Sequence, residues 1–337
     1  MTVIKEAIIA LSKKQDLSFE MARSVMDEIM SGQATPVQMS AYLTALSLKG
    51  ETIDEITASA AGMRSHCVRL LHDIDALEIV GTGGDGSDSF NISTTAAILT
   101  AAAGIPVAKH GNRSASSKCG SADVLEALGV NINIPPEKSA ELLEKIGICF
   151  LFAQNYHIAM KYVAPVRREL GIRTVFNILG PLTNPAGANM ELMGVYDRDL
   201  VEPLAKVLMN LGVKNAMVVH GCDGLDEISI SGATTVCEVK NGWTKAYEIT
   251  PEQFGFERCD KSALIGGNSA ENAAILRAVL SSEKSPKRNA AVLNAAAAVY
   301  IAGKCDSIQE AVGVIEKVID SGKASAKLDE FVRYSHS

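Results

Sequence analysis

Apolar positions in residues 1–72 recur at helical spacing, and residues typical of helix ends separate the apolar stretches. Thr35 stands three residues before Gln38, which is the spacing of an N-terminal capping box. Thr52 stands at the same distance before Glu55. Nothing in this stretch has the pattern of a β-strand, so we expect consecutive short helices that form a small bundle.

The pattern changes at Leu77, after which short apolar runs alternate with helical stretches. The runs that predict strands are Leu77–Val80, Ile105–Ala108, Ile148–Phe152, Leu192–Tyr196 and Ala216–Val219. The stretches that predict helices between them are 93–103, 121–129, 136–146, 157–170 and 199–211. This alternation implies a mainly parallel sheet covered by helices.

A hairpin interrupts the alternation near the end of the chain. Val236–Lys240 and Trp243–Ile249 flank Asn241-Gly242, a dipeptide typical of a type I′ turn. Three further helices are predicted over 268–282, 286–302 and 307–321, and Ser307 with Glu310 has the spacing of another capping box. The whole pattern predicts an α/β fold with a small N-terminal helical domain and a large α/β domain.

Composition narrows the class of protein. With 337 residues and 47% hydrophobic content, the chain is long enough for a large domain and a smaller one. A net charge of −7 argues against general nucleic-acid binding, which needs a basic surface. Seven scattered cysteines without a CxxC pair fit a reducing compartment. The amphipathic N-terminus does not resemble a signal peptide, and no apolar run approaches a membrane span, so we expect a cytoplasmic protein with no membrane partner.

Two small segments suggest an anion site. Gly81–Asp85 follows the first predicted strand, and its glycines would let the backbone N–H groups approach a phosphate. A tight turn after a strand would have the same composition. Asn91–Thr95 opens a predicted helix with hydroxyl groups and free N–H groups, where the helix dipole favours an anion. Ordinary N-capping by Ser93 or Thr94 is the alternative.

The segment 109–121 is the most specific. It contains three Lys or Arg residues, four serines and two glycines, in what we expect to be a dense polar loop that leads into a helix at Ser121. A solvated charged loop has no need of so many small hydroxyl residues, so this composition favours a polyanion site.

Asp226 and Glu227 are the candidate metal ligands. Adjacent carboxylates repel each other unless a cation is present, and Mg²⁺ is commonly held by carboxylates together with substrate phosphates. The preceding strand Ala216–Val219 would deliver them to the carboxyl edge of a parallel sheet, where ligands bind. The alternative is a pair of exposed charges on a loop.

The segments GTGGD, NIST and KHGNRSASSKCGSADVLEALG occur in this order. Together with Val166–Pro185 and Val218–Glu227, they make essentially the whole chain resemble the nucleoside phosphorylase and phosphoribosyltransferase superfamily, and within it the anthranilate phosphoribosyltransferase family. The resemblance implies transfer of a 5-phosphoribosyl group from phosphoribosyl diphosphate (PRPP) to the amine of anthranilate, in tryptophan biosynthesis and with Mg²⁺ as cofactor.

The same resemblance implies roles for individual residues. Those expected to hold PRPP are Gly81, Gly84, Asp85, Ser89, Asn91, Ile92, Ser93, Thr94, Lys109, His110, Gly111, Asn112, Arg113, Ser114, Ala115, Ser116, Ser117 and Ser121. Those expected to contact anthranilate are Gly81, Asn112 and Arg167, and those expected to bind magnesium are Ser93, Asp226 and Glu227. No general base is assigned, because the aromatic amine is neutral at pH 7 and attacks without prior deprotonation.

The resemblance also bears on organisation. We expect a small domain over 1–72, which part of 160–185 joins in some family members, and a large PRPP-binding domain over 73–337, with the active site between them. The family further implies a homodimer through the helical domain, where apolar residues such as Met39, Tyr42, Leu43 and Leu46 need cover.

Two other functions are compatible with the motifs. A pyrimidine nucleoside phosphorylase shares the Lys-His-Gly-Asn-Arg-Ser segment, but such proteins have an additional C-terminal α/β domain and need no metal, whereas only 228–337 follows the acidic pair here. A non-enzymatic, nucleic-acid-binding member of the superfamily should have a basic groove and degraded ligand motifs, which the net charge and the intact motifs disfavour.

Overall fold

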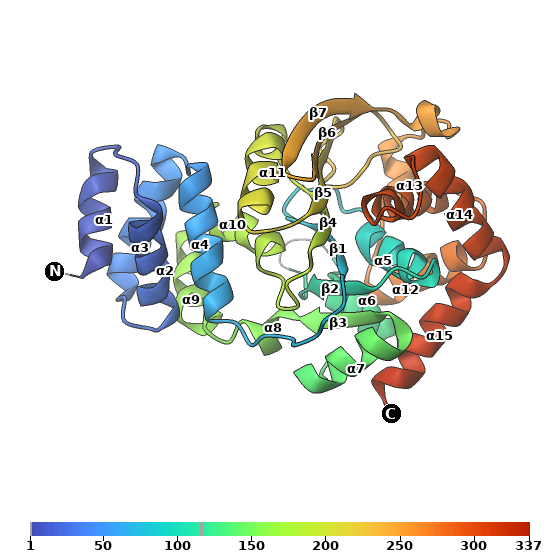
Figure 1. Cartoon of the computed structure of the whole chain (residues 1–337), viewed down its shortest axis with the longest axis horizontal. Coiled ribbons are helices and arrows are strands. Elements are labelled where there is room, and N and C mark those ends of the chain that lie inside the picture. Colours follow the sequence, from blue (N-terminus) through green and yellow to red (C-terminus); the bar gives the residue numbers. More distant parts are fainter. Residues whose placement is uncertain (1, 115–117) are drawn as a thin grey trace.

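The computed structural model describes residues 2–114 and 118–337, and its N-terminal part is purely helical. The helices are α1 (Val3–Ser12), α2 (Phe19–Met30), α3 (Pro36–Lys49) and α4 (Ile53–Ser65), which lie together at one end of the molecule (Figure 1). Both predicted capping boxes are present, with Thr35 and Gln38 at the start of α3 and Thr52 and Glu55 at the start of α4. The predicted helical bundle is therefore confirmed.

A seven-stranded sheet with the order β3-β2-β1-β4-β5-β6-β7 forms the centre of the molecule. Its strands are β1 (Leu77–Gly81), β2 (Val107–Gly111), β3 (Ile148–Phe152), β4 (Met190–Gly194), β5 (Asn215–Gly221), β6 (Thr234–Lys240) and β7 (Trp243–Ile249). The first five strands are parallel, and the last two pair antiparallel as a hairpin. Asn241 and Gly242 both have positive φ, 50° and 80°, as a type I′ turn requires.

Strand β2 begins later than predicted and continues through Gly111, so Lys109 and His110 belong to a strand and not to a loop. All five residues of β2 pair with β3, which gives their backbone groups partners on that side. The polar side chains Lys109 and His110 are only 3% and 5% exposed. A local sequence pattern gives no sign of this, because buried charged residues look like loop residues when their partners are far away in sequence.

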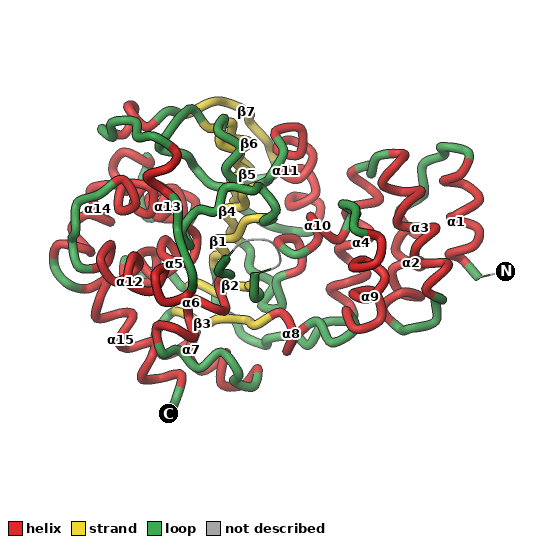
Figure 2. The backbone as a smooth tube through the Cα atoms, turned by 180° about the vertical axis from the view of Figure 1, so that it is seen from behind, coloured by secondary structure: helices red, strands yellow, loops and turns green. Residues whose placement is uncertain are grey.

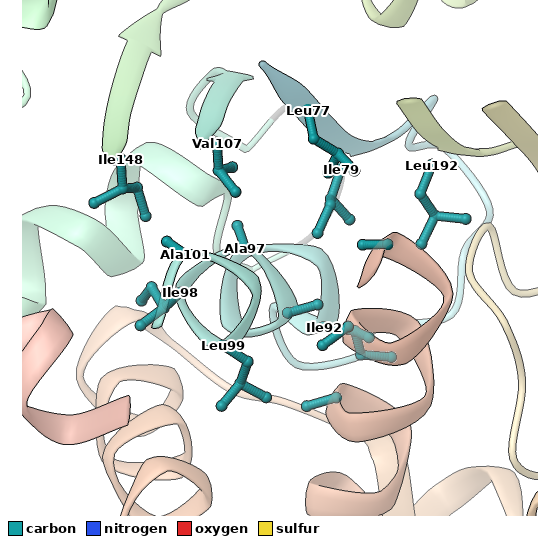
Figure 3. Packing of buried hydrophobic residues seen from close by; sticks show 14 of the residues in the cluster. Leu77, Ile79, Ile92, Ala97, Ile98, Leu99, Ala101, Val107, Ile148 and Leu192 are labelled. Carbon is teal, nitrogen blue, oxygen red and sulfur yellow. The ribbon is translucent and has the colours of Figure 1, made fainter. Parts of the chain in front are cut away.

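Helices cover both faces of the sheet. The first core joins one face to α5 (Ile92–Ala102), α6 (Ser121–Leu128), α7 (Pro136–Ile146), α12 (Ser269–Leu280), α13 (Pro286–Ile301), α14 (Ile308–Asp320) and α15 (Lys323–Ser335). Figure 3 shows the strand residues Leu77, Ile79 and Val107 facing α5 within this core. The last helix, α15, was not predicted; its apolar residues Leu328 and Phe331 are buried in this core.

The second core joins the opposite face of the sheet to α11 (Val201–Asn210) and to the N-terminal helices. Three short segments return to those helices from the far edge of the sheet, namely α8 (Ala153–Tyr156), α9 (Met160–Leu170) and α10 (Phe176–Leu179). Helix α9 contacts α2 and α3, and α10 contacts α4. We call α1–α4 with α9 and α10 the helical body; Figure 2 shows it beside the sheet.

Two predictions need correction. Ser307 accepts a hydrogen bond from the Glu310 N–H, but the Glu310 carboxylate binds the N–H of Asp306 and not that of Ser307, so the predicted box is only half formed. The apolar residues Met39, Tyr42, Leu43 and Leu46 are at most 3% exposed within the single chain, so they do not need cover from a second copy.

In the described part of the chain, none of the helices is both long and apolar enough to cross a bilayer.

Candidate active site

A cleft of about 1050 Å³ lies where the carboxyl ends of the central strands meet the helical body. Every predicted site residue that the structure describes lines this cleft: Gly81, Gly84, Asp85, Ser89, Asn91, Ile92, Ser93, Thr94, Lys109, His110, Gly111, Asn112, Arg113, Ser114, Ser121, Arg167, Asp226 and Glu227. The predicted residues Ala115, Ser116 and Ser117 lie outside the described residues. Segments far apart in the sequence therefore meet in one cavity.

The glycine loop after β1 lies at the point where the sheet order reverses. From β1 the chain continues to β2 and β3 on one side of β1, and it later places β4 on the other side. Ligands commonly bind at such a switch point in the strand order. A Cβ atom on Gly81 would collide with the carboxylate of Asp226, and one on Gly194 would collide with its backbone. Gly83 and Gly84 have φ of 68° and 71°, a region that favours glycine. These glycines therefore let the loop and the acidic pair approach each other closely.

Asp226 and Glu227 are buried at 8% and 7% exposure, so the alternative of two exposed loop charges is wrong. Asp226 accepts a hydrogen bond of 2.7 Å from the Gly83 N–H, and Glu227 accepts one of 3.1 Å from the Ser93 N–H at the start of α5. Burial raises the pKa of Asp226 well above its ordinary value, and the nearby charge of Asp85 raises it further. Burial also raises the pKa of Glu227 to about 7, against the attraction of Lys109.

Lys109 reaches the floor of the cleft from β2. Its ammonium donates hydrogen bonds to the Ile79 carbonyl at 2.7 Å and to the Ser93 hydroxyl at 3.3 Å. Burial lowers the pKa of Lys109, while the charges of Glu78, Glu227 and Asp226 oppose this effect. A buried cation thus faces the acidic pair across the N-terminus of α5.

Two imidazoles lie together in the cleft, and one of them was not predicted. The rings of His110 and His157 have centroids 5.0 Å apart. Burial lowers the pKa of His110 to about 3 and that of His157 to about 4, so both rings are neutral at pH 7. Among the described residues, neither Nε2 atom has a hydrogen-bond partner.

Arg113 lines the cleft, but its guanidinium already has partners on α6. It forms ion pairs with Glu126 at 2.5 Å and with Asp123 at 3.0 Å, which raise its pKa above the ordinary value. It also stacks over Phe152, with 5.5 Å to the ring centroid. A ligand that binds Arg113 therefore either displaces Asp123 or Glu126 from the guanidinium or binds beside them.

The helical body supplies the opposite wall. Arg167 is half-buried on α9, with its guanidinium 5.3 Å from the ring centroid of Phe176, whereas Arg168 is exposed. Sequence reasoning assigned no role to the other residues of this wall, which include Met63, His157, Met160, Ala164, Phe176, Asn177, Gly180 and Pro181. The available signal for Phe176, Asn177, Gly180 and Pro181 was the family-typical stretch 166–185, in which they lie; the other residues of this wall had no such signal.

The comparisons with known proteins agree along the whole chain. A family model described as "Glycosyl transferase family, helical bundle domain" matches residues 5–67, and one described as "Glycosyl transferase family, a/b domain" matches residues 73–325. The chain is 64% identical over 335 residues to an anthranilate phosphoribosyltransferase of Methanobrevibacter smithii, covering 99% of this chain and 100% of that protein.

Solved structures give the same result. The anthranilate phosphoribosyltransferase of Thermus thermophilus is similar with a TM-score of 0.94 and 46% identity, over 100% of both chains. The Saccharomyces cerevisiae anthranilate phosphoribosyltransferase in complex with PRPP and Mg is similar with a TM-score of 0.91 and 29% identity, over 99% of this chain and 98% of that chain. The chain therefore belongs to the anthranilate phosphoribosyltransferase family, within the glycosyl transferases that the two family models describe.

Proposed function

We propose that this enzyme transfers the 5-phosphoribosyl group of PRPP to the amine of anthranilate, giving N-(5-phosphoribosyl)anthranilate and diphosphate in tryptophan biosynthesis. One observation carries the proposal: a glycine loop, a helix N-terminus and a buried lysine converge on one cleft, and a half-buried arginine stands on the wall that the helical body provides. The cleft thus has an anion-binding side and a separate side for the acceptor.

The anion-binding side is suited to the diphosphate and phosphate groups of PRPP. The glycine loop 81–86 and the first turn of α5 line this side, and Lys109 adds a buried positive charge; the Gly83 and Ser93 N–H groups bond the acidic pair there. Family resemblance assigns the cradle to the eighteen PRPP residues named above, including the three outside the described structure. The location of the other fifteen along a single cleft supports this assignment.

The acidic pair fits Mg²⁺. Asp226 and Glu227 offer carboxylate oxygens, and Ser93 offers a hydroxyl beside them. No group of three or more His, Cys, Asp or Glu residues within 2–114 and 118–337 forms a self-contained metal site. Mg²⁺ commonly binds one or two carboxylates and completes its shell with water and substrate phosphates, so two carboxylates suffice. When bound, the ion would supply positive charge against the diphosphate.

The residues of the chain then act by position and charge. As the bond between the anomeric carbon and the diphosphate oxygen breaks, its electron pair leaves with the diphosphate, and Lys109 and the loop N–H groups stabilise the growing negative charge. The neutral amine nitrogen forms the new bond to the anomeric carbon and afterwards loses a proton to water. His110 and His157, with pKa values of about 3 and about 4, are poor bases, which agrees with a reaction that needs no strong general base.

Anthranilate would bind on the helical-body side. A guanidinium grips a carboxylate through two parallel hydrogen bonds, and Arg167 is the arginine of α9 that lines the cleft. Among the described residues, no acidic side chain forms an ion pair with it. Gly81 and Asn112, the other residues that the family assigns to anthranilate, line the same cleft.

The decisive assay mixes the protein with PRPP, Mg²⁺ and anthranilate and follows the loss of anthranilate fluorescence. We expect decay that requires all three components. A protein that instead cleaves uridine or thymidine with phosphate, without need of metal, would be a nucleoside phosphorylase. A protein that shows neither activity but shifts DNA in a salt-dependent manner would be a nucleic-acid-binding relative.

The metal assignment predicts a large loss of turnover in Asp226→Asn and Glu227→Gln. Loss of one electrostatic contribution of this kind costs about 3 kcal/mol of transition-state stabilisation. The measurement is kcat at limiting and saturating Mg²⁺, together with the shift in thermal unfolding that Mg²⁺ and PRPP produce. Wild-type turnover at limiting Mg²⁺ in both variants would contradict the assignment.

Three further properties are part of the proposal. The small domain comprises 1–72 with part of 160–185, as the packing of α9 and α10 supports, and the large domain comprises the remainder of 73–337. The protein is a homodimer through the helical body, as the family resemblance implies. It is cytoplasmic, in agreement with seven cysteines that are all free thiols.

A further inference from the structure

Strands β1 and β2 separate just before they reach the cleft. Leu77 pairs with Val107, and the described register goes no further, although β1 pairs with β4 along all five of its residues. If the β1–β2 ladder continued in the same register, the backbone of Ile79 would bond the Ala108 carbonyl and the His110 N–H. The Ala108 carbonyl and the His110 N–H flank Lys109 in β2. The contacts that replace the backbone hydrogen bonds therefore determine the position of this lysine.

Side chains take the place of the missing backbone bonds. The Glu78 carboxylate accepts a 2.8 Å hydrogen bond from the His110 N–H, and the Asn184 amide donates one of 2.8 Å to the Ala108 carbonyl. The Lys109 ammonium donates to the Ile79 carbonyl. The same Asn184 amide also donates to the second oxygen of Glu78. The Ala108 carbonyl, the His110 N–H and the Ile79 carbonyl therefore each have a side-chain partner in place of the backbone ladder.

Glu78 is central to this arrangement. It is completely buried, and its two oxygens accept hydrogen bonds from two different donors, His110 and Asn184. Burial raises the pKa of Glu78 to about 7, while the hydrogen bonds from Asn184 and His110 and the charge of Lys109 favour its ionised form. Burial lowers the pKa of Lys109, and Glu78 is the first of the carboxylates that oppose this. Glu191, the residue paired with Glu78 on β4, is also buried, but within the described residues its carboxylate forms no hydrogen bond to β2.

We propose that Glu78 is a positioning residue, which holds β2 apart from β1 and keeps the Lys109 ammonium at the floor of the PRPP site. It does not line the cleft, and it acts by way of the β2 backbone at His110, chiefly on the position of Lys109. The role rests on the proposed function, because it assumes that Lys109 faces the diphosphate. Glutamine is a poor substitute, because its amide would confront the amide of Asn184, which is itself fixed by the Ala108 carbonyl and the Ala186 N–H.

The test is the dissociation constant of PRPP with Mg²⁺, measured by isothermal titration calorimetry on the full-length protein. Glu78→Gln should weaken PRPP binding at least about tenfold, as expected for loss of charge-assisted hydrogen bonds, and should change the KM for anthranilate much less. Glu78→Asp, which keeps the charge, should recover part of the affinity. Glu191→Gln is the matched control, since it removes the neighbouring buried carboxyl and should leave PRPP affinity within about twofold.

A double-mutant cycle separates positioning from general damage. In a Lys109→Gln background, Glu78→Gln should weaken PRPP binding by less than about twofold, because the residue through which it acts is gone. Additive losses, unchanged PRPP affinity in Glu78→Gln, or an equal loss in Glu191→Gln would each overturn the proposal. If Glu78→Gln does not fold, Asn184→Ala replaces it and must weaken PRPP binding selectively; unchanged affinity would then overturn the proposal.

The wild-type protein distinguishes the two levels of inference. If it shows no transfer to anthranilate, the proposed function is wrong. If it transfers normally and Glu78→Gln binds PRPP as the wild type does, only the positioning role is wrong.

Discussion

Arg167 and Arg168 are neighbours on α9 but occupy different environments. Arg167 is half-buried in the cleft beside Phe176, and burial lowers its pKa, whereas Arg168 is exposed to solvent. Successive residues on a helix lie about 100° apart, so only one of the two can face the cleft.

We therefore predict that Arg167→Ala raises the KM for anthranilate about tenfold or more, the size expected for a charge-assisted contact to a carboxylate, and raises the KM for PRPP less. Arg168→Ala is the matched control and should change both values little. Paired steady-state titrations decide the matter. If the two variants behave alike, or if the KM for PRPP moves most, Arg167 is not the carboxylate clamp.

His157 allows a prediction about pH. A free imidazole takes a proton near pH 6.5, whereas the folded protein resists protonation of His157 until about pH 4. Its contribution to stability is therefore complete above pH 6.5 and declines as the pH falls toward 4.

The variant His157→Gln removes this contribution. Between pH 7 and pH 5 the free energy of unfolding should fall by about 2 kcal/mol less in the variant than in the wild type, since one titrating group contributes about 1.4 kcal/mol per pH unit below 6.5. Urea unfolding at the two pH values gives the comparison. Parallel pH dependence in both proteins would mean that folding does not lower the pKa of His157.

At the level of elements, the two N-terminal capping boxes look equivalent in sequence but are not equivalent in the structure. The Gln38 side chain of α3 accepts a hydrogen bond from the N–H of its cap residue, Thr35, at the surface. Glu55 of α4 is completely buried and accepts hydrogen bonds from the N–H groups of Leu17 and Thr52 and from the Lys49 ammonium. It therefore joins the start of α4 to the loop before α2 and to the end of α3.

Removal of the two side chains should have unequal effects. Gln38→Ala should lower the free energy of unfolding by about 1 kcal/mol, as loss of a cap does, and Glu55→Ala by about 3 kcal/mol or more, because it leaves Lys49 without its buried partner. Chemical denaturation measures both. Equal losses would show that the buried contacts of Glu55 add nothing to the capping box.

At the level of the whole molecule, the predicted dimer must use residues other than those first considered. The helical body buries Met39 and Tyr42 internally, but Val37 of α3 is 79% exposed and Leu48 is 82% exposed. Exposed apolar residues of this size on one body are suited to an interface.

We predict that Val37→Glu weakens a dimer through the helical body. Trp243→Glu is the control, because Trp243 is an exposed apolar residue on β7 at a distance from that body along the sheet order. Analytical sedimentation at micromolar concentration should show a dimer for the wild type and the control, and a larger monomer fraction for Val37→Glu. A monomeric wild type would refute the dimer.

Local sequence signals were sufficient for much of this protein. Three features could be predicted from residues that are close together in the sequence: the capping residues before α3 and α4, the alternation after Leu77 and the Asn241-Gly242 turn. Each depends on interactions between residues only a few positions apart. Family resemblance added the site residues, and the described ones all line one cleft.

Long-range contacts decided the remainder. The gap between β1 and β2 depends on Glu78 and Asn184, which are 106 residues apart. The wall from the helical body depends on the packing of α9 and α10 against α2, α3 and α4. A buried charged side chain is stable only where the fold brings a donor or counter-charge to it, and no local pattern encodes that meeting. Composition and spacing thus indicated that Lys109 and the acidic pair carry chemistry, while tertiary packing determined that they are buried, opposed and held in place from β1.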